Sequence, residues 1–320
     1  MTSFAFVFPG QGSQAVGMLD AWGDHPVVAQ TLAEASDAMG EDIAKLIHEG
    51  PKEALALTTN TQPVMLVAAV AAYRVWLAEG GAAPSVVAGH SLGEYSALVA
   101  SGVLTLAQAA PLVRFRAQAM QEAVPVGTGA MAAILGLEAV KVMAGCAEAQ
   151  ATFGAGSAEV VEAVNFNDPA QTVIAGSKAA VDKACEVLKA HGAKRALPLP
   201  VSAPFHSSLM KPAAERLKEK LAATSFAPSS GEMKMVLTSK QDWASVWQAG
   251  PFSRTLINKV SASQSASIDI TCWVLPEVAP LCQSSFLERE KNTVSPSSRV
   301  FRSDSWFIQA IISTRPEVEL

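Results

Sequence analysis

The stretch that decides the fold is Ser85-Val86-Val87-Ala88-Gly89-His90-Ser91-Leu92-Gly93, followed by Glu94-Tyr95-Ser96-Ala97-Leu98-Val99-Ala100. An apolar, strand-like run turns at Ser91 into a helix-like run, and a glycine stands two residues to either side of the serine. This pattern is typical of a nucleophile elbow, a sharp strand-to-helix turn that exposes the serine hydroxyl at the carboxyl edge of a sheet. The N–H groups at the start of the helix would then face an oxyanion formed there. A serine that only caps a helix is the alternative.

Strand and helix patterns alternate up to the elbow. The sequence predicts strands over residues 4–8 and 85–88, and helices over residues 27–39 and 61–77. Such alternation is typical of a parallel sheet covered by helices. We therefore expect an α/β fold with an α/β-hydrolase-like parallel-sheet core.

The order of elements changes after residue 128. Strands are predicted over residues 130–135, 159–164, 172–174 and 194–198, with helices over residues 138–149 and 179–190. This β-α-β-β-α-β order matches a ferredoxin-like module. We expect residues 128–198 to be an inserted ferredoxin-like domain, and residues 1–127 with 199–225 to form the large core.

The composition describes an ordinary globular chain. Half of its 320 residues are hydrophobic and its formal net charge is −5, with no basic tract, so we do not expect nucleic acid as a partner. The longest apolar run, residues 64–72, ends at Tyr73 and Arg74, so no transmembrane helix or membrane partner is expected. Residues 2–8 lack the basic start of a signal peptide, so we expect a cytoplasmic protein, and a monomer.

The cysteines do not form a metal-binding or disulfide pattern. Cys146, Cys185, Cys272 and Cys282 show no CxxC spacing and no histidine at ligand spacing. We expect reduced thiols, no metal and no tightly bound cofactor.

A glycine loop follows the first predicted strand. Gly10, Gly12 and Ala15 match the spacing of a dinucleotide-binding fingerprint. That fold needs a second strand about 20 positions further on, whereas residues 32–39 are Ala-rich and helical in pattern. We instead expect the loop to bring Gln11 close to the elbow, where its backbone N–H and that of Leu92 could form an oxyanion hole.

A serine nucleophile needs a base, and His206 is the candidate among five histidines. It lies in a loop stiffened by Pro200 and Pro204, directly after the last strand of the predicted module. His90 adjoins the serine, but we expect its side chain to point away from the site and to be structural.

Arg116 is the third informative residue. Its helical neighbours three and four positions away are all apolar: Leu112, Val113, Ala119 and Met120. A guanidinium on an apolar face needs an anionic partner, and its fork matches a carboxylate; a side chain that extends past the apolar surface to water is the alternative. Arg114 has a more solvent-like setting, and Pro111 should kink or start a helix that is established by about Ala110.

These motifs together carry a family resemblance. They are Pro9-Gly10-Gln11-Gly12-Ser13-Gln14, Thr61-Gln62-Pro63, Gly89-His90-Ser91-Leu92-Gly93-Glu94, Arg116 with Met120, Asn165, and Ala203-Pro204-Phe205-His206-Ser207. Over about residues 1–225 the chain resembles the malonyl-CoA:acyl carrier protein transacylases of bacterial fatty-acid synthesis.

The resemblance implies a ping-pong acyl transfer with malonyl-CoA and acyl carrier protein as substrates. Ser91 would be the nucleophile, His206 its base, Gln11 and Leu92 the oxyanion hole, and Arg116 the binder of the malonyl carboxylate. Within the family, Leu92 and Phe205 resemble malonyl-selective enzymes. Acyl carrier proteins are acidic, and a basic rim is expected, with Lys211, Arg216, Lys218 and Lys220 as candidates. A simply solvated helix face is the favoured interpretation of these four residues.

Two other function classes remain open. A serine hydrolase such as a thioesterase shares the elbow but would usually place an acid between Ser91 and a late histidine; Asp168 is the nearest such acid, and it lies in the inserted module. An inactive protein that still binds acyl carrier protein is the third class.

The last 95 residues differ from the rest. Residues 226–320 hold 17 serines but only two glycines, Gly231 and Gly250. Members of the family would show here a valine-rich strand and a glutamine that orients the catalytic histidine, for which Gln248 is the nearest candidate and a poor one. We expect an atypical tail that departs from the family near Ser229, of out-of-frame or fused origin or poorly ordered, and in that case a core that lacks its closing strand and helix. A divergent but functional ending is the alternative.

Overall fold

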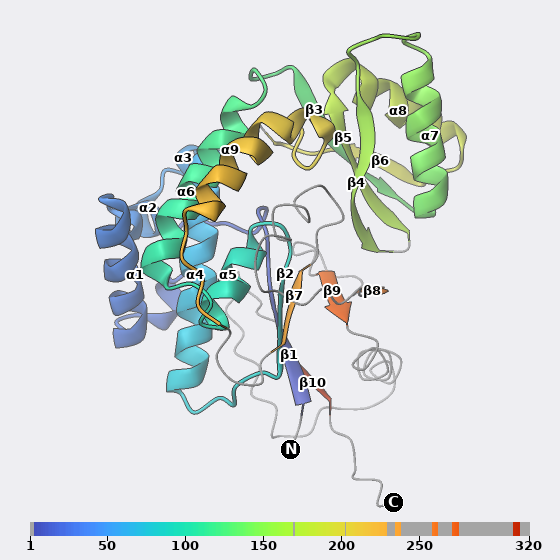
Figure 1. Ribbon diagram of the computed structural model, residues 1–320. Coiled ribbons are helices and arrows are strands. Elements are labelled where there is room, and N and C mark those ends of the chain that lie inside the picture. Colours follow the sequence, from blue (N-terminus) through green and yellow to red (C-terminus); the bar gives the residue numbers. More distant parts are fainter. Residues whose placement is uncertain are drawn as a thin grey trace, which may run out of the picture.

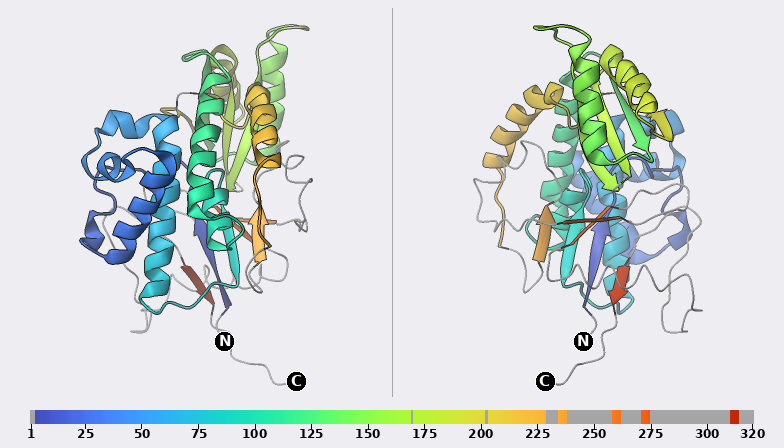
Figure 2. Two further views of the ribbon diagram at one scale, coloured as in Figure 1. Left: turned by 60° about the vertical axis from the view of Figure 1, so that its left-hand side comes forward. Right: turned by 90° about the vertical axis from the view of Figure 1, so that its right-hand side faces the viewer.

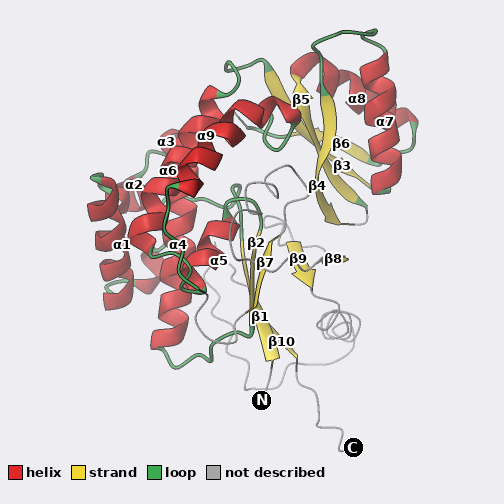
Figure 3. Ribbon diagram, viewed as in Figure 1, coloured by secondary structure: helices red, strands yellow, loops and turns green. Residues whose placement is uncertain are grey.

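The structure is a computed structural model, and it describes residues 3–168, 170–201, 203–228, 234–237, 258–261, 271–274 and 310–313. Figure 1 and Figure 3 show a large part, in which helices cover a sheet, and a small subdomain with a sheet of its own. The predicted α/β fold with a small inserted unit is confirmed.

The sheet of the large part is mainly parallel and has the elbow strand inside it. Its strands are β1 (Ser3–Phe8), β2 (Val86–Gly89), β7 (Lys234–Leu237) and β10 (Ala310–Ser313), in the order β10-β1-β2-β7. β2 pairs in parallel with both β1 and β7, and β10 is antiparallel to β1. The carboxyl ends of β1 and β2 point toward the small subdomain (Figures 1 and 2).

Helices form a thick layer on this sheet. They are α1 (Pro26–Met39), α2 (Ile43–Glu49), α3 (Lys52–Ala56), α4 (Thr58–Ala78), α5 (Gly93–Ala100), α6 (Leu106–Glu122) and α9 (Lys211–Ala222), with 3-10 turns η1 (Asp20–Trp22) and η2 (Ser208–Met210). The fingerprint loop thus leads into η1 and α1, which confirms that residues 32–39 are helical and form no second strand.

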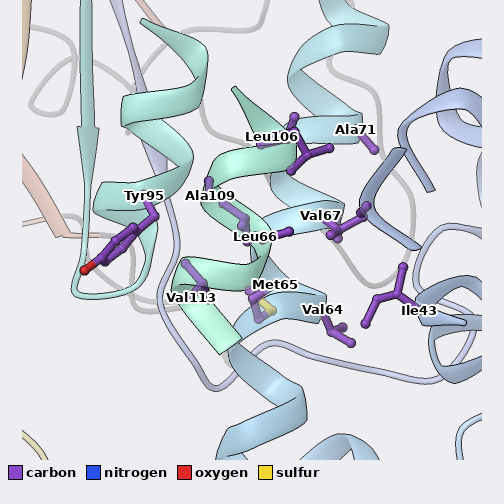
Figure 4. Packing of buried hydrophobic residues seen from close by; sticks show 14 of the residues in the cluster. Ile43, Val64, Met65, Leu66, Val67, Ala71, Tyr95, Leu106, Ala109 and Val113 are labelled. Atoms are coloured by element: carbon purple, nitrogen blue, oxygen red, sulfur yellow. The ribbon is translucent and has the colours of Figure 1, made fainter. Parts of the chain in front are cut away.

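The buried core lies where α4 meets α6 and the sheet. Figure 4 shows Leu66 and Val67 of α4 among Leu106, Ala109 and Val113 of α6. On the sheet side, the aromatic ring of Tyr73 packs edge-on against those of Phe6 and Phe8, with ring centroids 5.4 and 6.0 Å apart. Edge-to-face contacts of this kind stabilise by more than their buried area alone.

α6 begins earlier than the sequence suggests. Thr105 caps it in a reciprocal capping box with Gln108, and the helix then runs from Leu106 through Pro111. The prediction of a helix by about Ala110 is confirmed, and Pro111 lies within the helix and does not start it, because the capping box supplies hydrogen bonds to the first turn.

The small subdomain has the predicted element order. It consists of β3 (Gly129–Leu135), α7 (Ala139–Ala151), β4 (Val161–Asp168), β5 (Gln171–Ser177), α8 (Lys178–Ala190) and β6 (Arg195–Pro198). Its antiparallel sheet has the order β4-β5-β3-β6, with the two helices packed on it. This is the ferredoxin-like arrangement, and β4 is an edge strand.

The tail contributes four strands to the described residues. β7 and β10 join the large sheet, while β8 (Asn258–Ser261) and β9 (Thr271–Val274) pair with each other in antiparallel fashion. β7 pairs in parallel with β2 on the side away from β1. The sequence led us to expect no closing strand in the core, but β2 has a strand from the tail beside it. The predicted departure near Ser229, and Gln248, lie outside the described residues.

One helix of the described part, α4, is long and apolar enough to cross a membrane by length and composition alone. The protein itself buries 72% of its most apolar 18-residue window. A buried core helix meets the same criterion, and α4 is the central helix of this core.

Candidate active site

The turn from β2 to α5 is the predicted elbow. Ser91 has φ of 52°, in the left-handed region that side chains other than glycine rarely adopt. A Cβ at Gly89 would lie 1.9 Å from the Gly93 carbonyl carbon, and one at Gly93 would lie 2.2 Å from the Phe8 carbonyl oxygen. Both positions therefore require glycine, and the tight packing holds Ser91 in its strained conformation.

The glycine loop lies against this turn, as the sequence predicts. The His90 N–H donates to the Phe8 carbonyl over 3.0 Å, and a Cβ at Gly10 would lie 2.9 Å from the His90 carbonyl oxygen. Leu92 is the N-cap residue of α5. Among the described residues, the backbone N–H groups of Gln11 and Leu92 donate to no protein acceptor. Both donors therefore stand at the same sheet edge with hydrogen-bonding capacity left for a ligand.

Arg116 reaches this edge from α6. It is 5% exposed, and its Nη2 donates to Ser91 Oγ over 3.1 Å. Its guanidinium carbon also lies 5.8 Å from the centre of the Tyr95 ring. The alternative of a side chain extending to water is excluded, and the guanidinium is directly beside the nucleophile.

A chain of hydrogen bonds connects Arg116 to Gln62 and Thr58, on the first turns of α4. Arg116 Nη1 donates to Gln62 Oε1, Gln62 Nε2 donates to Thr58 Oγ1 over 3.5 Å, and Thr58 Oγ1 donates to Gln11 Oε1. Sequence reasoning used Gln62 only as part of a motif and gave Thr58 no role. The available signal was that Gln62 is buried at the start of the apolar part of α4.

Burial determines the electrostatics around Arg116. Loss of hydration lowers the pKa of Arg116, while neighbouring Tyr95 and Glu94 raise it. Burial raises the pKa of Tyr95 to about 12, against the opposing effect of Arg116. Glu94 is 5% exposed and supplies negative charge near the guanidinium. Tyr95 therefore stays neutral beside the guanidinium.

His206 stands in the loop that follows β6. Its φ is 66°, and its loop is tied by bonds from Ser207 N and Oγ to the Pro204 carbonyl and from Ser208 N to Glu162 Oε2 over 2.5 Å. Burial, then the charges of Arg116 and His90, lower the pKa of His206 to about 3. The imidazole is neutral at pH 7, as a general base must be. Neither ring nitrogen hydrogen-bonds to another described residue.

His90 is not where the sequence analysis places it. Its Nε2 lies 3.1 Å from Nδ2 of Asn165 on β4, and its charge acts on His206. The prediction that this side chain points away from the site is wrong, because His90 contacts Asn165 of the small subdomain and lies close enough to His206 to lower its pKa. Asn165 thus links the two parts of the molecule at the elbow.

The sequence also makes predictions about two sets of basic residues outside the site, Arg114 and the four on α9. Arg114 is more exposed than Arg116, as predicted, although its side chain is only 13% exposed; it donates to the Thr59 carbonyl and to Asn60 Oδ1 and pairs with Glu41. The four basic residues of α9 are exposed. Of these, Arg216 pairs with Glu122 over 2.6 Å and lies on the Phe115 ring.

No metal site or disulfide is found among the described residues. They contain no group of three or more His, Cys, Asp or Glu side chains able to hold a metal. Cys146 is a buried free thiol whose pKa burial raises to about 12, and Cys185 is also free.

A groove of about 770 Å³ runs along α7 and β4, lined by Met143, Cys146 and Gln150 among others, away from Ser91. The side chains of Cys272, Cys282 and Asp168 lie outside the described residues.

Comparison with known proteins agrees with this geometry. The acyl transferase domain family matches residues 5–264. The malonyl CoA-acyl carrier protein transacylase of Escherichia coli is 56% identical over 227 residues, which is 71% of this chain and 72% of that protein. The same enzyme of Bacillus subtilis is 46% identical over 226 residues, 70% of this chain and 69% of that protein.

Solved structures give the same result. The acyl-carrier-protein S-malonyltransferase of Burkholderia pseudomallei is 61% identical with a TM-score of 0.71, covering 77% of this chain and 79% of that one. A malonyl-transacylase in complex with a type II PKS acyl carrier protein is 49% identical with a TM-score of 0.70, over the same shares. The chain therefore belongs to the malonyl CoA-acyl carrier protein transacylase family.

Proposed function

We propose that this protein transfers the malonyl group from malonyl-CoA to the phosphopantetheine thiol of acyl carrier protein, through an acyl-serine intermediate on Ser91. The observation that carries the proposal is the buried Arg116 guanidinium, with Nη2 3.1 Å from Ser91 Oγ. One methylene separates the thioester carbonyl of malonyl-CoA from its carboxylate. A guanidinium next to the nucleophile is therefore within reach of that carboxylate when the carbonyl is under attack.

The first half-reaction acylates the serine. Ser91 Oγ attacks the thioester carbonyl while neutral His206 takes the hydroxyl proton. The N–H groups of Gln11 and Leu92 donate to the oxyanion. The C–S bond then breaks, coenzyme A leaves with the proton from His206, and malonyl remains on Ser91.

The second half-reaction uses the same groups in reverse. His206 takes the proton of the acceptor thiol, the sulfur attacks the malonyl ester, and the proton returns to Ser91 Oγ as the ester bond breaks. Since Arg116 holds the carboxylate in both halves, the acyl group keeps its orientation while the thiols exchange.

Intact-mass spectrometry after brief exposure to malonyl-CoA tests the proposal. The native protein should gain a malonyl adduct, Ser91→Ala should gain none, and Arg116→Ala should gain it much more slowly. Free malonate released without an acceptor would instead identify a hydrolase. Folded protein that binds acyl carrier protein but forms no adduct would identify a binding protein without activity.

The proposal also covers partners and compartment. Malonyl-CoA and acyl carrier protein are the proposed partners, supported by the names of the relatives and by the relative solved with an acyl carrier protein. We also propose that the protein is a cytoplasmic monomer. Size-exclusion chromatography with light scattering and cell fractionation test these two statements.

A further inference from the structure

We propose that Thr58 is a positioning residue for acylation, which couples the oxyanion loop at Gln11 to the carboxylate-binding Arg116. The proposal rests on the function given above. It concerns a residue that touches no substrate and acts through two neighbours.

The physical basis is a continuous chain of side-chain hydrogen bonds. Arg116 bonds to Ser91 Oγ with one guanidinium nitrogen and to Gln62 Oε1 with the other. The Gln62 amide group donates to Thr58 Oγ1, and the Thr58 hydroxyl donates to Gln11 Oε1. The chain thus begins at the nucleophile and ends on the residue proposed to supply an oxyanion-hole N–H.

The guanidinium fixes the direction of the first two bonds of this hydrogen-bond chain, from Arg116 to Gln62 and from Gln62 to Thr58. A guanidinium can only donate, so Gln62 must present its carbonyl oxygen to Arg116 and its NH₂ group to Thr58. Thr58 then accepts from Gln62 and has its single proton left for Gln11. A flipped Gln62 amide would place its NH₂ group against the guanidinium, and two donors cannot form a hydrogen bond. The orientation with Oε1 toward Arg116 is therefore favoured.

The middle of this hydrogen-bond chain is protected from water, and its end at Gln11 is partly buried. Thr58 is 3% exposed, Gln62 is 1% exposed and Arg116 is 5% exposed. The Gln62–Thr58 bond is long, at 3.5 Å, but breaking a hydrogen bond between buried groups leaves a polar atom without solvent to replace its partner. A movement of the Arg116 side chain is therefore transmitted through these hydrogen bonds toward Gln11.

The loop at the far end needs such a tether. Gly12 follows Gln11 with φ of 127°, a conformation open to glycine, and its N–H donates to the side chain of Gln14, two residues away. Among the described residues, the Gln11 side chain makes its hydrogen bond with Thr58. Without the Thr58 hydroxyl, the Gln11 N–H loses the contact that fixes its position beside the elbow.

The chemical consequence is a link between recognition and catalysis. A carboxylate on Arg116 orders the guanidinium, and through Gln62 and Thr58 that order extends to the oxyanion loop. An acyl group without a carboxylate, such as acetyl, cannot produce this effect. Malonyl is therefore favoured over acetyl by more than its direct contact with Arg116.

The test compares Thr58→Val with Thr61→Val. Both substitutions remove a hydroxyl from α4 with little change of shape. Thr61 is 2% exposed, and its hydroxyl donates to the main-chain carbonyls of Leu55 and Leu57 rather than to a site residue. Thermal melts of the full chain establish that both variants are folded, and single-turnover acylation of Ser91 is then followed by mass spectrometry.

We expect Thr58→Val to lower the maximal rate of malonyl acylation about tenfold, with the half-saturating concentration changed less than about threefold, because Arg116 remains. Thr61→Val should acylate at the native rate. The loss caused by Thr58→Val should shrink below about threefold in an Arg116→Ala background and with acetyl-CoA, as for two residues that act as a unit.

Two outcomes overturn the coupling. If Thr58→Val and Thr61→Val acylate alike, Thr58 has no positioning role; if Thr58→Val costs the same factor with Arg116→Ala as without it, Thr58 acts on Gln11 alone. In both cases the malonyl-Ser91 adduct of the native protein would still support the proposed function. A native protein that forms no adduct would overturn both proposals.

Discussion

Arg116 Nη2 donates a hydrogen bond to Ser91 Oγ over 3.1 Å, so the cation and the nucleophile of the site are in direct contact before any substrate binds. This contact has two consequences. It stabilises negative charge on the serine oxygen, and it fixes where a substrate carboxylate must lie relative to the attacked carbonyl.

Arg116→Lys keeps the positive charge but removes the planar fork. We expect malonyl acylation of Ser91 to slow by about 10- to 100-fold, since one bidentate, charge-assisted contact is lost. Rapid-quench mass spectrometry with malonyl-CoA measures this. Arg114→Lys is the matched control on the same helix; it should change the melting temperature through its contacts with Glu41 and Asn60 but leave the acylation rate unaltered.

The acid side of the pH profile should reflect His206. Because its pKa is lowered to about 3, the base stays neutral well below pH 6.5. We expect kcat/KM for malonyl-CoA at pH 5 to remain within about twofold of its value at pH 7. An acid limb centred near pH 6.5 would contradict the burial of this imidazole.

The same shift predicts how stability depends on pH. Between about pH 6.5 and 3 the unfolded chain binds a proton at His206 that the folded chain does not. The free energy of unfolding is therefore highest above pH 6.5 and falls as the pH is lowered toward 3. His206→Asn should flatten this dependence in urea titrations at several pH values; equal slopes in both proteins would refute the prediction.

Gly89→Ala should disrupt the elbow. The added methyl would lie 1.9 Å from the Gly93 carbonyl carbon, and backbone on both sides would have to move. We expect the free energy of unfolding to fall by about 3 kcal/mol or more, with loss of the malonyl adduct. Gly40→Asn is the control, because that helix-ending glycine has φ of 64° and open space around it; it should cost less than about 1 kcal/mol.

Glu162 ties β4 to the loop that carries His206. Its Oε2 accepts from the Ser208 N–H over 2.5 Å. Glu162→Ala should lower the free energy of unfolding by about 1–2 kcal/mol and slow acylation severalfold, because the loop after His206 loses its charged anchor. Glu162→Gln, which keeps an acceptor, should recover most of the rate.

A second carboxylate of the small subdomain serves as the control for Glu162. Glu186 lies on α8 in an exposed pair with Lys183, and Glu186→Ala should change stability by less than about 0.5 kcal/mol. If Glu162→Ala behaved like Glu186→Ala, the bond to Ser208 would have no positioning role.

The sequence predicts the parts of the site that have a local signature. Ser91 lies between glycines at a strand-to-helix change, and Arg116 lies among apolar residues at helical spacing, so each can be recognised from its neighbours. The six elements of the small subdomain follow from their alternating patterns in the same way. These features were predicted because they depend on a few adjacent residues.

The residues that were missed depend on contacts between distant segments. Gln62 and Thr58 acquire their roles only when α4 packs beside α6 and the glycine loop, and His90 only when β4 comes over the elbow. The short helices α2 and α3 and the pairing of β7 with β2 have no strong local pattern either. These features depend on tertiary packing, and the hydrophobic periodicity of the sequence does not indicate which segments pack together.

The position of β2 between β1 and β7 has a consequence for synthesis of the protein. The nucleophile lies in the first third of the chain, whereas β7 begins at Lys234. On the ribosome, the strand that carries Ser91 therefore has one open side until the segment 234–237 has emerged. Its unpaired N–H and C=O groups can meanwhile bind a strand of another molecule. A chain stopped before Lys234 would keep Ser91 and His206 in its sequence and yet leave the elbow strand open to aggregation.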